Sequence, residues 1–323
     1  MPRVPELAIV PEMESPVSPT TAWRTDPGLV RSHNEDFVAV YEPATAEDLQ
    51  QHGRLYIVAD GVGGADAGEV ASRYASERTL HHYLAAVEIE NRGERLLEAM
   101  QAANTDLRRL ASGRDNSRRM ATTMVAAVVG DGQTYIGNVG DSRAYLLHNG
   151  ELEQITQDQS LVAQLLQEGA LTAEEAARYP YKNIILYSIG SEKRPPIDLY
   201  EVSLAPGDFL LLCSDGLTRH VGDSEIRDII GRESPQEATE TLVGLARERG
   251  GEDNITVAVV RNGDSALATD EHISEPVDKP ATAVAMSGVE RQRSLWPFTI
   301  FLTMILIVLI VLLWIVIQRA TML

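Results

Sequence analysis

Short aliphatic runs, each joined to an aspartate, recur along the first 262 positions of the chain. Residues 55–59 lead into Asp60, residues 209–214 lead into Asp215, residues 255–260 follow Asp253 and Asn254, and Asp36 opens the run 37–41. Runs of this length and composition predict buried strands. Carboxylates converging at the ends of such strands would repel one another unless cations lay between them. The pattern therefore predicts a polynuclear metal site.

The rest of this region predicts blocks of strands beside blocks of helices. Apolar spacing of three and four predicts helices at 68–87 and 94–111. Asp131-Gly132 and Asn149-Gly150 suit the turns of hairpins. The remaining predicted elements are strands at 22–25, 122–129, 134–139, 143–148 and 152–155, a helical stretch at 160–177, and helices near 224–231 and 235–249. Blocks of this kind favour an α+β layered fold with antiparallel sheets.

The far end of the chain predicts a membrane helix. Residues 298–317 carry no charge and, at about 1.5 Å per residue, cover roughly 30 Å, the thickness of a bilayer core. Trp296 and Trp314 lie near the two ends of this segment, as interfacial aromatics do. More cationic residues precede it (Lys279, Arg291, Arg293) than follow it (Arg319), which places the large N-terminal part in the cytoplasm. We expect one transmembrane helix at 295–318, in a single-pass protein of the plasma membrane.

Composition divides the remaining chain into three parts. Residues 1–21 are proline-rich and read as a disordered leader without a secretory signal; residues 22–262 form the globular domain; residues 263–294 form a flexible linker. The single cysteine, Cys213, has no internal partner for a disulfide, which fits a reducing compartment. A formal net charge of −19 argues against a nucleic-acid partner.

Six motifs, in order along residues 22–262, resemble those of the metal-dependent, type 2C (PPM) protein serine/threonine phosphatases in their bacterial form. They are Arg31-Ser32-His33-Asn34-Glu35-Asp36, Val58-Ala59-Asp60-Gly61-Val62-Gly63-Gly64, Thr122-Thr123, Asn138-Val139-Gly140-Asp141-Ser142-Arg143, Ser214-Asp215-Gly216-Leu217 and Asp253-Asn254-Ile255-Thr256. The resemblance implies a four-layer α-β-β-α sandwich of two antiparallel sheets. It also implies two Mn²⁺ or Mg²⁺ ions at one edge of the paired sheets.

The same resemblance implies a role for each matching residue. Asp60 would bridge the two ions, and the Gly61 carbonyl would help to hold one of them. Asp215 and Asp253 would ligate the other ion, whereas Asp36 would act through coordinated waters. Asp141, with Asp215, resembles the ligands of a weaker third site. Arg31 matches the phosphate-binding arginine of the family.

The chemistry of these residues agrees with the resemblance. Carboxylate and carbonyl ligands without a His/Cys cluster favour hard cations such as Mg²⁺ or Mn²⁺ over Zn²⁺. Two such ions can activate a water for in-line attack on phosphorus. The planar fork of Arg31 suits a phosphate, although a surface ion pair with Glu35 or Asp36 is the alternative.

Some positions depart from the family pattern. Val62 stands where some members carry a histidine proposed as general acid; His33 is a candidate substitute, with a purely structural histidine as the alternative. Gln159 replaces a more usual histidine, and Ala121 replaces a glycine. The segment 158–190 resembles the flap that borders the groove in bacterial members, or is a simple surface helix.

The sequence thus predicts a membrane-anchored phosphatase facing the cytoplasm. Its expected partners are phosphoproteins, including a membrane serine/threonine kinase and its substrates, and the lipid bilayer. Two alternatives stay open: a tethered phosphoprotein-binding module without catalysis, and a phosphatase of small phosphate esters.

Overall fold

The computed structural model describes residues 21–63, 67–112, 120–130, 132–181 and 183–263. The predicted leader (up to residue 20), almost all of the linker and the predicted membrane helix at 295–318 lie outside these ranges. Within them, no helix has both the length and the apolar character needed to cross a membrane.

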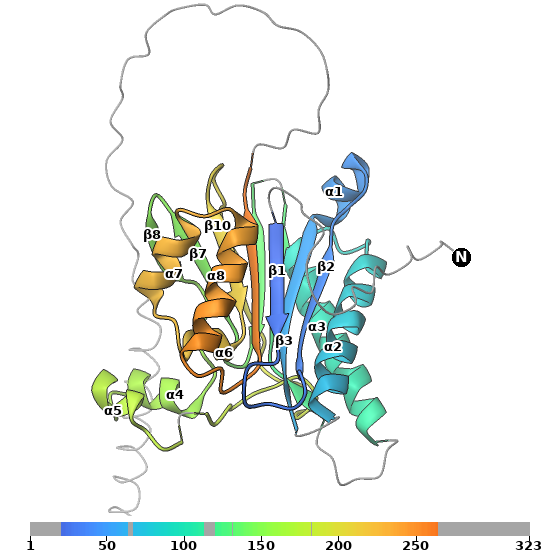
Figure 1. Cartoon of the computed structure of the whole chain (residues 1–323). Coiled ribbons are helices and arrows are strands. Elements are labelled where there is room, and N and C mark those ends of the chain that lie inside the picture. Colours follow the sequence, from blue (N-terminus) through green and yellow to red (C-terminus); the bar gives the residue numbers. More distant parts are fainter. Residues whose placement is uncertain (1–20, 64–66, 113–119, 131, 182, 264–323) are drawn as a thin grey trace, which may run out of the picture. The chain divides into compact units, whose positions relative to one another are not determined.

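The described domain is built on two antiparallel sheets (Figure 1). One sheet has five strands in the spatial order β1 (Thr21–Asp26), β11 (Ile255–Arg261), β10 (Phe209–Cys213), β7 (Arg143–His148) and β8 (Glu151–Gln154). The second sheet has the order β2 (Asp36–Tyr41), β3 (Arg54–Val62), β5 (Met124–Val129), β6 (Thr134–Val139) and β9 (Asp198–Val202), with β4 (Ala121–Thr122) paired to β3.

Helices cover the outer face of each sheet. The six-stranded sheet packs against α2 (Ala67–Ala85) and α3 (Arg92–Ser112), and the five-stranded sheet packs against α7 (Asp223–Ile230) and α8 (Pro235–Glu248) (Figure 1). The remaining helices are α1 (Ala46–His52), α4 (Leu161–Gln167), α5 (Ala173–Ala177) and α6 (Asp215–Thr218). The expected α-β-β-α order of layers is confirmed for this domain.

The central strands are apolar on both faces because each face meets a different layer. In β3, Tyr56 and Val58 point between the sheets, whereas Leu55 and Ile57 belong to the core beneath α2 and α3. Alternate residues of a strand face opposite sides, so a sheet covered on both sides needs continuous aliphatic runs. This explains why antiparallel strands here lack the usual alternation of apolar and polar residues.

Local hydrogen bonds and backbone geometry correct two of the predicted elements and add a third that was not predicted. The predicted strand 122–129 is divided into β4 and β5, and Thr123 between them donates its amide hydrogen to the Asp60 carbonyl (2.9 Å). The predicted helical stretch 160–177 is two short helices, and Gly169 between them has a φ of +71°, which helices do not continue through. Helix α1 was not predicted; Thr45 caps it by accepting the Asp48 amide hydrogen.

Candidate active site: an acidic centre at the strand ends

Antiparallel pairing brings the predicted site residues to one edge of the two sheets. Asp36 begins β2 and lies directly opposite Asp60 near the end of β3. In the other sheet Cys213, at the end of β10, pairs with Val257 of β11 and with Arg143 of β7. Asp215 follows β10 by two positions, and Asp253 and Asp141 each precede the neighbouring strand by two. We call Asp36, Asp60, Asp141, Asp215 and Asp253 the acidic centre.

Asp36 is buried and is fixed by a residue of the other sheet. Its side chain is held by Ser214, whose Oγ donates to Asp36 Oδ2 at 2.7 Å. The Ser214 Oγ also accepts the amide hydrogen of Thr256 at 3.0 Å. A single hydroxyl therefore joins the start of β2 to the ends of β10 and β11.

Asp60 is held through its backbone. Its carbonyl accepts from Thr123 N at 2.9 Å and from Thr122 Oγ1 at 2.8 Å, while its amide donates to Thr123 Oγ1 at 3.2 Å. These bonds leave the Asp60 carboxylate free to point away from the sheet. The paired threonines thus support the centre without belonging to it.

Glycine follows Asp60 and Asp215 because neighbouring backbone approaches both positions closely. A Cβ on Gly61 would meet the carbonyl oxygens of Glu35 and Gly68, and one on Gly216 would meet the carbonyl oxygen of Asn254. A side chain at either position would therefore displace a loop of the centre.

Two arginines, Arg219 and Arg31, lie against the carboxylates of Asp215 and Asp253. Arg219 Nε donates to Asp215 Oδ2 at 2.9 Å, and its Nη1 lies 3.6 Å from Asp253 Oδ2. Arg31 Nη2 donates to the same Asp253 oxygen at 2.9 Å. Arg31 therefore forms its ion pair with Asp253. The alternative prediction from the sequence, an ion pair with Glu35 or Asp36, is wrong. Half of the Arg31 side chain is exposed, so an incoming anion can reach it.

Burial and neighbouring negative charges oppose the ionisation of four carboxyls of the centre, those of Asp36, Asp60, Asp141 and Asp215. Burial, followed by the charges of neighbouring aspartates, raises the pKa of Asp36 to about 7 and that of Asp141 to about 8. Burial and then the charges of Asp36, Asp215 and the other aspartates hold the pKa of Asp60 well above its ordinary value. Burial also raises the pKa of Asp215, against the lowering effect of Arg219. Asp60 therefore lies within electrostatic reach of each of the other four carboxyls.

The centre fits divalent cations by the chemistry of its donors. Asp36 Oδ1, Asp141 Oδ1 and Asp215 Oδ1 are buried carboxylate oxygens without a hydrogen-bond partner. Buried charge without a partner is costly, and hard divalent ions prefer oxygen ligands of this type. Arg31 and Arg219 form ion pairs with carboxylate oxygens of Asp253 and Asp215. With the side chains in these positions, no three His, Cys, Asp or Glu residues of the described ranges are grouped closely enough to hold a metal ion.

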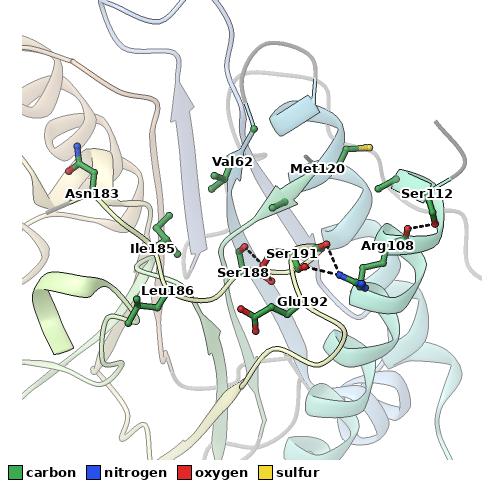
Figure 2. Close-up of a pocket in the computed structure, with 14 residues that line it drawn as sticks. Val62, Arg108, Ser112, Met120, Asn183, Ile185, Leu186, Ser188, Ser191 and Glu192 are labelled. Carbon is green, nitrogen blue, oxygen red and sulfur yellow. Dashed lines mark hydrogen bonds between the residues drawn. The ribbon is translucent and has the colours of Figure 1, made fainter. Parts of the chain in front are cut away.

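A groove of about 750 Å³ begins beside the centre (Figure 2). Val62 and Gly63 line it directly after Gly61, together with residues of α3, β4 and the segment 183–192, of which 183–190 belong to the predicted flap. Val62 is 37% exposed and has no proton to donate. His33 is exposed; its carbonyl, rather than its ring, is anchored, by Asn254 Nδ2 at 2.9 Å.

The sequence did not reveal the roles of three residues of the site. Ser214 was read only as part of a motif, Arg219 was not considered, and Asn254 was read as the neighbour of Asp253. Asn254 Oδ1 accepts from Glu35 N at 2.7 Å, and its Nδ2 donates to Pro27 O, so it fixes the loop that carries Arg31. Only Arg219 had a detectable signal, since it stands four positions after Asp215 and α6 brings such pairs together.

One position that departs from the family pattern, Gln159, has hydrogen-bond partners for its side-chain amide. Gln159 accepts from Gly140 N at 3.0 Å and donates to Asp198 Oδ2 at 2.8 Å. The adjacent Asp158 accepts two hydrogen bonds from Arg143, at 2.8 and 2.7 Å. These bonds secure the loop that contains Asp141.

Comparison with known proteins gives one consistent family. Residues 32–272 match the protein phosphatase 2C family. The chain is 41% identical over 245 residues to the serine/threonine phosphatase stp of Listeria welshimeri, covering 74% of this chain and 94% of the relative. It is 40% identical over 241 residues to the protein phosphatase PhpP of Streptococcus pneumoniae, covering 73% and 94%.

Solved structures agree. The Mycobacterium tuberculosis serine/threonine phosphatase PstP/Ppp superposes with a TM-score of 0.67 at 34% identity, over 75% of this chain and 98% of that one. The catalytic domain of the serine/threonine protein phosphatase PstP in complex with two manganese ions gives a TM-score of 0.64 at 35% identity, over 76% and 98%.

Proposed function

Since this chain belongs to the protein phosphatase 2C family and is a metal-dependent protein serine/threonine phosphatase, we propose that its acidic centre is where phosphoserine and phosphothreonine are hydrolysed. The observation that carries this assignment is the convergence of five carboxyls, three of them with an unpartnered buried oxygen, beside an accessible arginine.

In this proposal the aspartates hold two divalent ions. Asp60 and the Gly61 carbonyl would hold one ion, and Asp60, Asp215 and Asp253 would hold the other. Asp36 acts through water, and Asp141 with Asp215 forms a weaker third site. Mn²⁺ or Mg²⁺ bound there would lower the pKa of water and offset the charge of the phosphoryl group. The unpartnered oxygens of Asp36, Asp141 and Asp215 support this distribution.

The chain's own residues bind and orient the substrate. Arg31 exchanges its bond to Asp253 for the phosphate, which offers a planar guanidinium two acceptor oxygens. Ser214 holds the Asp36 carboxylate in one orientation, and the threonines behind Asp60 fix its backbone. Val62, which lines the groove next to the centre, cannot donate a proton to the leaving group. His33 as the proton donor stays a prediction.

Substitution of Asp60 tests the proposal. We expect Asp60→Asn to lower Mn²⁺-dependent hydrolysis of p-nitrophenyl phosphate and of a phosphothreonine peptide by more than about a hundredfold, since even the partners behind metal ligands cost about 10–100-fold. Asp228→Asn, at an exposed surface pair, is the matched control. Wild-type protein that binds phosphopeptide without cleaving it would instead support the binding-module alternative. Faster cleavage of sugar phosphates than of the peptide would support a phosphatase of small esters.

The sequence also supports anchoring of this phosphatase in the plasma membrane. Residues 298–317 are uncharged, and we propose that 295–318 span the bilayer with the phosphatase domain in the cytoplasm. Anchoring would raise the local concentration of partners in the same membrane, a serine/threonine kinase and its substrates among them. Carbonate-resistant membrane association that is lost on deleting 295–318 tests the anchor. The phosphoproteome of cells carrying only Asp215→Asn tests the substrates.

A further inference from the structure

Helix α3 fixes the segment 190–195 through a row of polar side chains. Gln101, Asn104 and Arg108 succeed one another on one side of the helix, and Asn104 is fully buried. Their bonds to the segment are Gln101 Nε2 to Pro195 O (2.9 Å), Asn104 Nδ2 to Glu192 O (3.1 Å) and Lys193 O (3.2 Å), Gly190 N to Asn104 Oδ1 (2.7 Å), and Arg108 Nη1 to Ser191 O (2.8 Å). Five backbone groups of the segment are thereby satisfied, so Lys193 and Arg194 stand on a fixed support.

A hollow of about 520 Å³ lies between the helix and this segment. Its lining consists of Gln101, Ala102, Thr105, Arg108, Lys193 and Arg194. Three of these six residues are cations and none is a carboxylate. Lys193 and Arg194 are exposed and form no ion pair within the described part of the chain. We call this hollow the cation pocket; it is a local exception in a chain whose formal net charge is −19.

The cation pocket adjoins the groove that begins at the acidic centre. Arg108 lines both hollows, and Figure 2 shows it bonded to the segment that closes the groove. At the other end Val62 follows Asp60 by two positions. Because Val62 and Gly63 directly follow Asp60 and Gly61 in the chain, a peptide that extends from the centre along the groove would approach Arg108 and the cation pocket. Among the described residues that line the groove, Glu192 is the only carboxylate.

We propose that the cation pocket binds an acidic side chain, a carboxylate or a second phosphate, of the same substrate protein. The inference rests on the function proposed above and adds a substrate class to it: phosphoproteins with acidic or multiply phosphorylated sequences around the target residue. Guanidinium and ammonium groups recognise these anions directly. At physiological ionic strength charges are screened beyond about 8 Å, so the local cations outweigh the negative charge of the rest of the chain.

A peptide series measures this preference. One phosphothreonine peptide with neutral flanks is compared with peptides in which a glutamate or a phosphoserine is moved through successive positions on each side. For full-length wild-type protein with Mn²⁺, we expect kcat/KM to rise about tenfold at one window of positions, the scale of two or three surface ion pairs. The rise should shrink in high salt.

Charge reversal at Lys193 and Arg194 tests whether the cation pocket causes the preference for acidic peptides. Lys193→Glu/Arg194→Glu should abolish the ratio of kcat/KM between acidic and neutral peptides. The matched control, Arg109→Glu/Arg232→Glu, makes the same charge change at exposed residues outside the pocket and should keep the ratio. If circular dichroism shows that the charge-reversed protein does not fold, the variant Lys193→Ala/Arg194→Ala takes its place in the comparison.

Two results overturn the inference: equal kcat/KM for every peptide, or the same ratio in the pocket variant and its control. Both are distinct from failure of the proposed function, in which the neutral phosphothreonine peptide would not be hydrolysed at all.

Discussion

Ser214 donates its hydroxyl hydrogen to Asp36 across the two sheets, with 2.7 Å between the oxygens. The same hydroxyl accepts the Thr256 amide hydrogen, and both of its partners are buried. The acidic centre consequently depends on a residue that binds no substrate.

Removing this hydroxyl should destabilise the domain. Ser214→Ala leaves a buried carboxylate oxygen and a buried amide without their partner, and we expect a loss of about 1–3 kcal/mol in the free energy of unfolding. Urea denaturation measures it. Ser76→Ala is the control, because the buried Ser76 hydroxyl has no partner among the described residues. Equal losses in the two variants would mean that the bond to Asp36 contributes nothing.

Arg219 should compete with metal ions for the outer carboxylates. It contacts Asp215 and lies 3.6 Å from Asp253, and only 24% of its side chain is exposed. Removing this positive charge in Arg219→Ala should tighten Mn²⁺ binding about threefold to tenfold, since a nearby cation raises the energy of a bound one. Isothermal titration calorimetry compares the variant with Arg227→Ala, whose ion pair lies at the surface. Weaker binding in Arg219→Ala would show that the arginine positions the ligands instead.

The geometry of the Arg31 guanidinium should matter as much as its charge. Arg31→Lys retains the charge but loses the planar pair of donors, and we expect kcat/KM on a phosphothreonine peptide to fall about tenfold or more. Mn²⁺ affinity, measured on the same preparation, separates an effect on phosphate from one on Asp253. Arg24→Lys, on β1, is the control. An unchanged kcat/KM would remove Arg31 from phosphate binding.

The metal-free domain should lose stability as pH rises. A carboxyl whose pKa is raised in the folded state binds its proton more tightly there than in the unfolded chain, where the pKa is about 4. The resulting stabilisation is present at low pH and is lost as pH rises through about 7 for Asp36 and about 8 for Asp141. The loss begins above about pH 4 and is complete near pH 8, so we expect the Tm in EDTA to fall between about pH 5 and about pH 8, and Mn²⁺ to restore it.

Asp141→Asn isolates one contribution to this pH dependence. The amide cannot ionise, so the fall in Tm over the same interval should be smaller than in the wild type. The same fall in both proteins would place the titration in other groups.

Much of the fold was predictable because its strands are covered on both faces. The aliphatic runs that this requires marked β2, β3, β10 and β11, and the motif spacing marked the aspartates at their ends. Helix α1 gave no such signal, since only Leu49 and His52 of its seven residues are buried. Its position depends on capping by Thr45 rather than on an apolar stripe.

The partners of the site residues were less predictable than the site residues themselves. The motifs marked Arg31, and the sequence suggested its neighbours Glu35 and Asp36 as ion-pair partners. The structure pairs it with Asp253, 222 positions away, because Asn254 fixes the loop 27–35 against the start of β11. Contacts of this range arise from the pairing of β1 with β11, which local pattern does not encode.

The acidic centre takes Asp36 and Asp60 from one sheet and Asp215 and Asp253 from the flank of the other. A ligand that joins all four would act as a non-covalent cross-link, so resistance of the domain to mechanical shear should depend on what the centre holds. Catalysis and the mechanical stability of the domain would therefore depend on the same carboxylates.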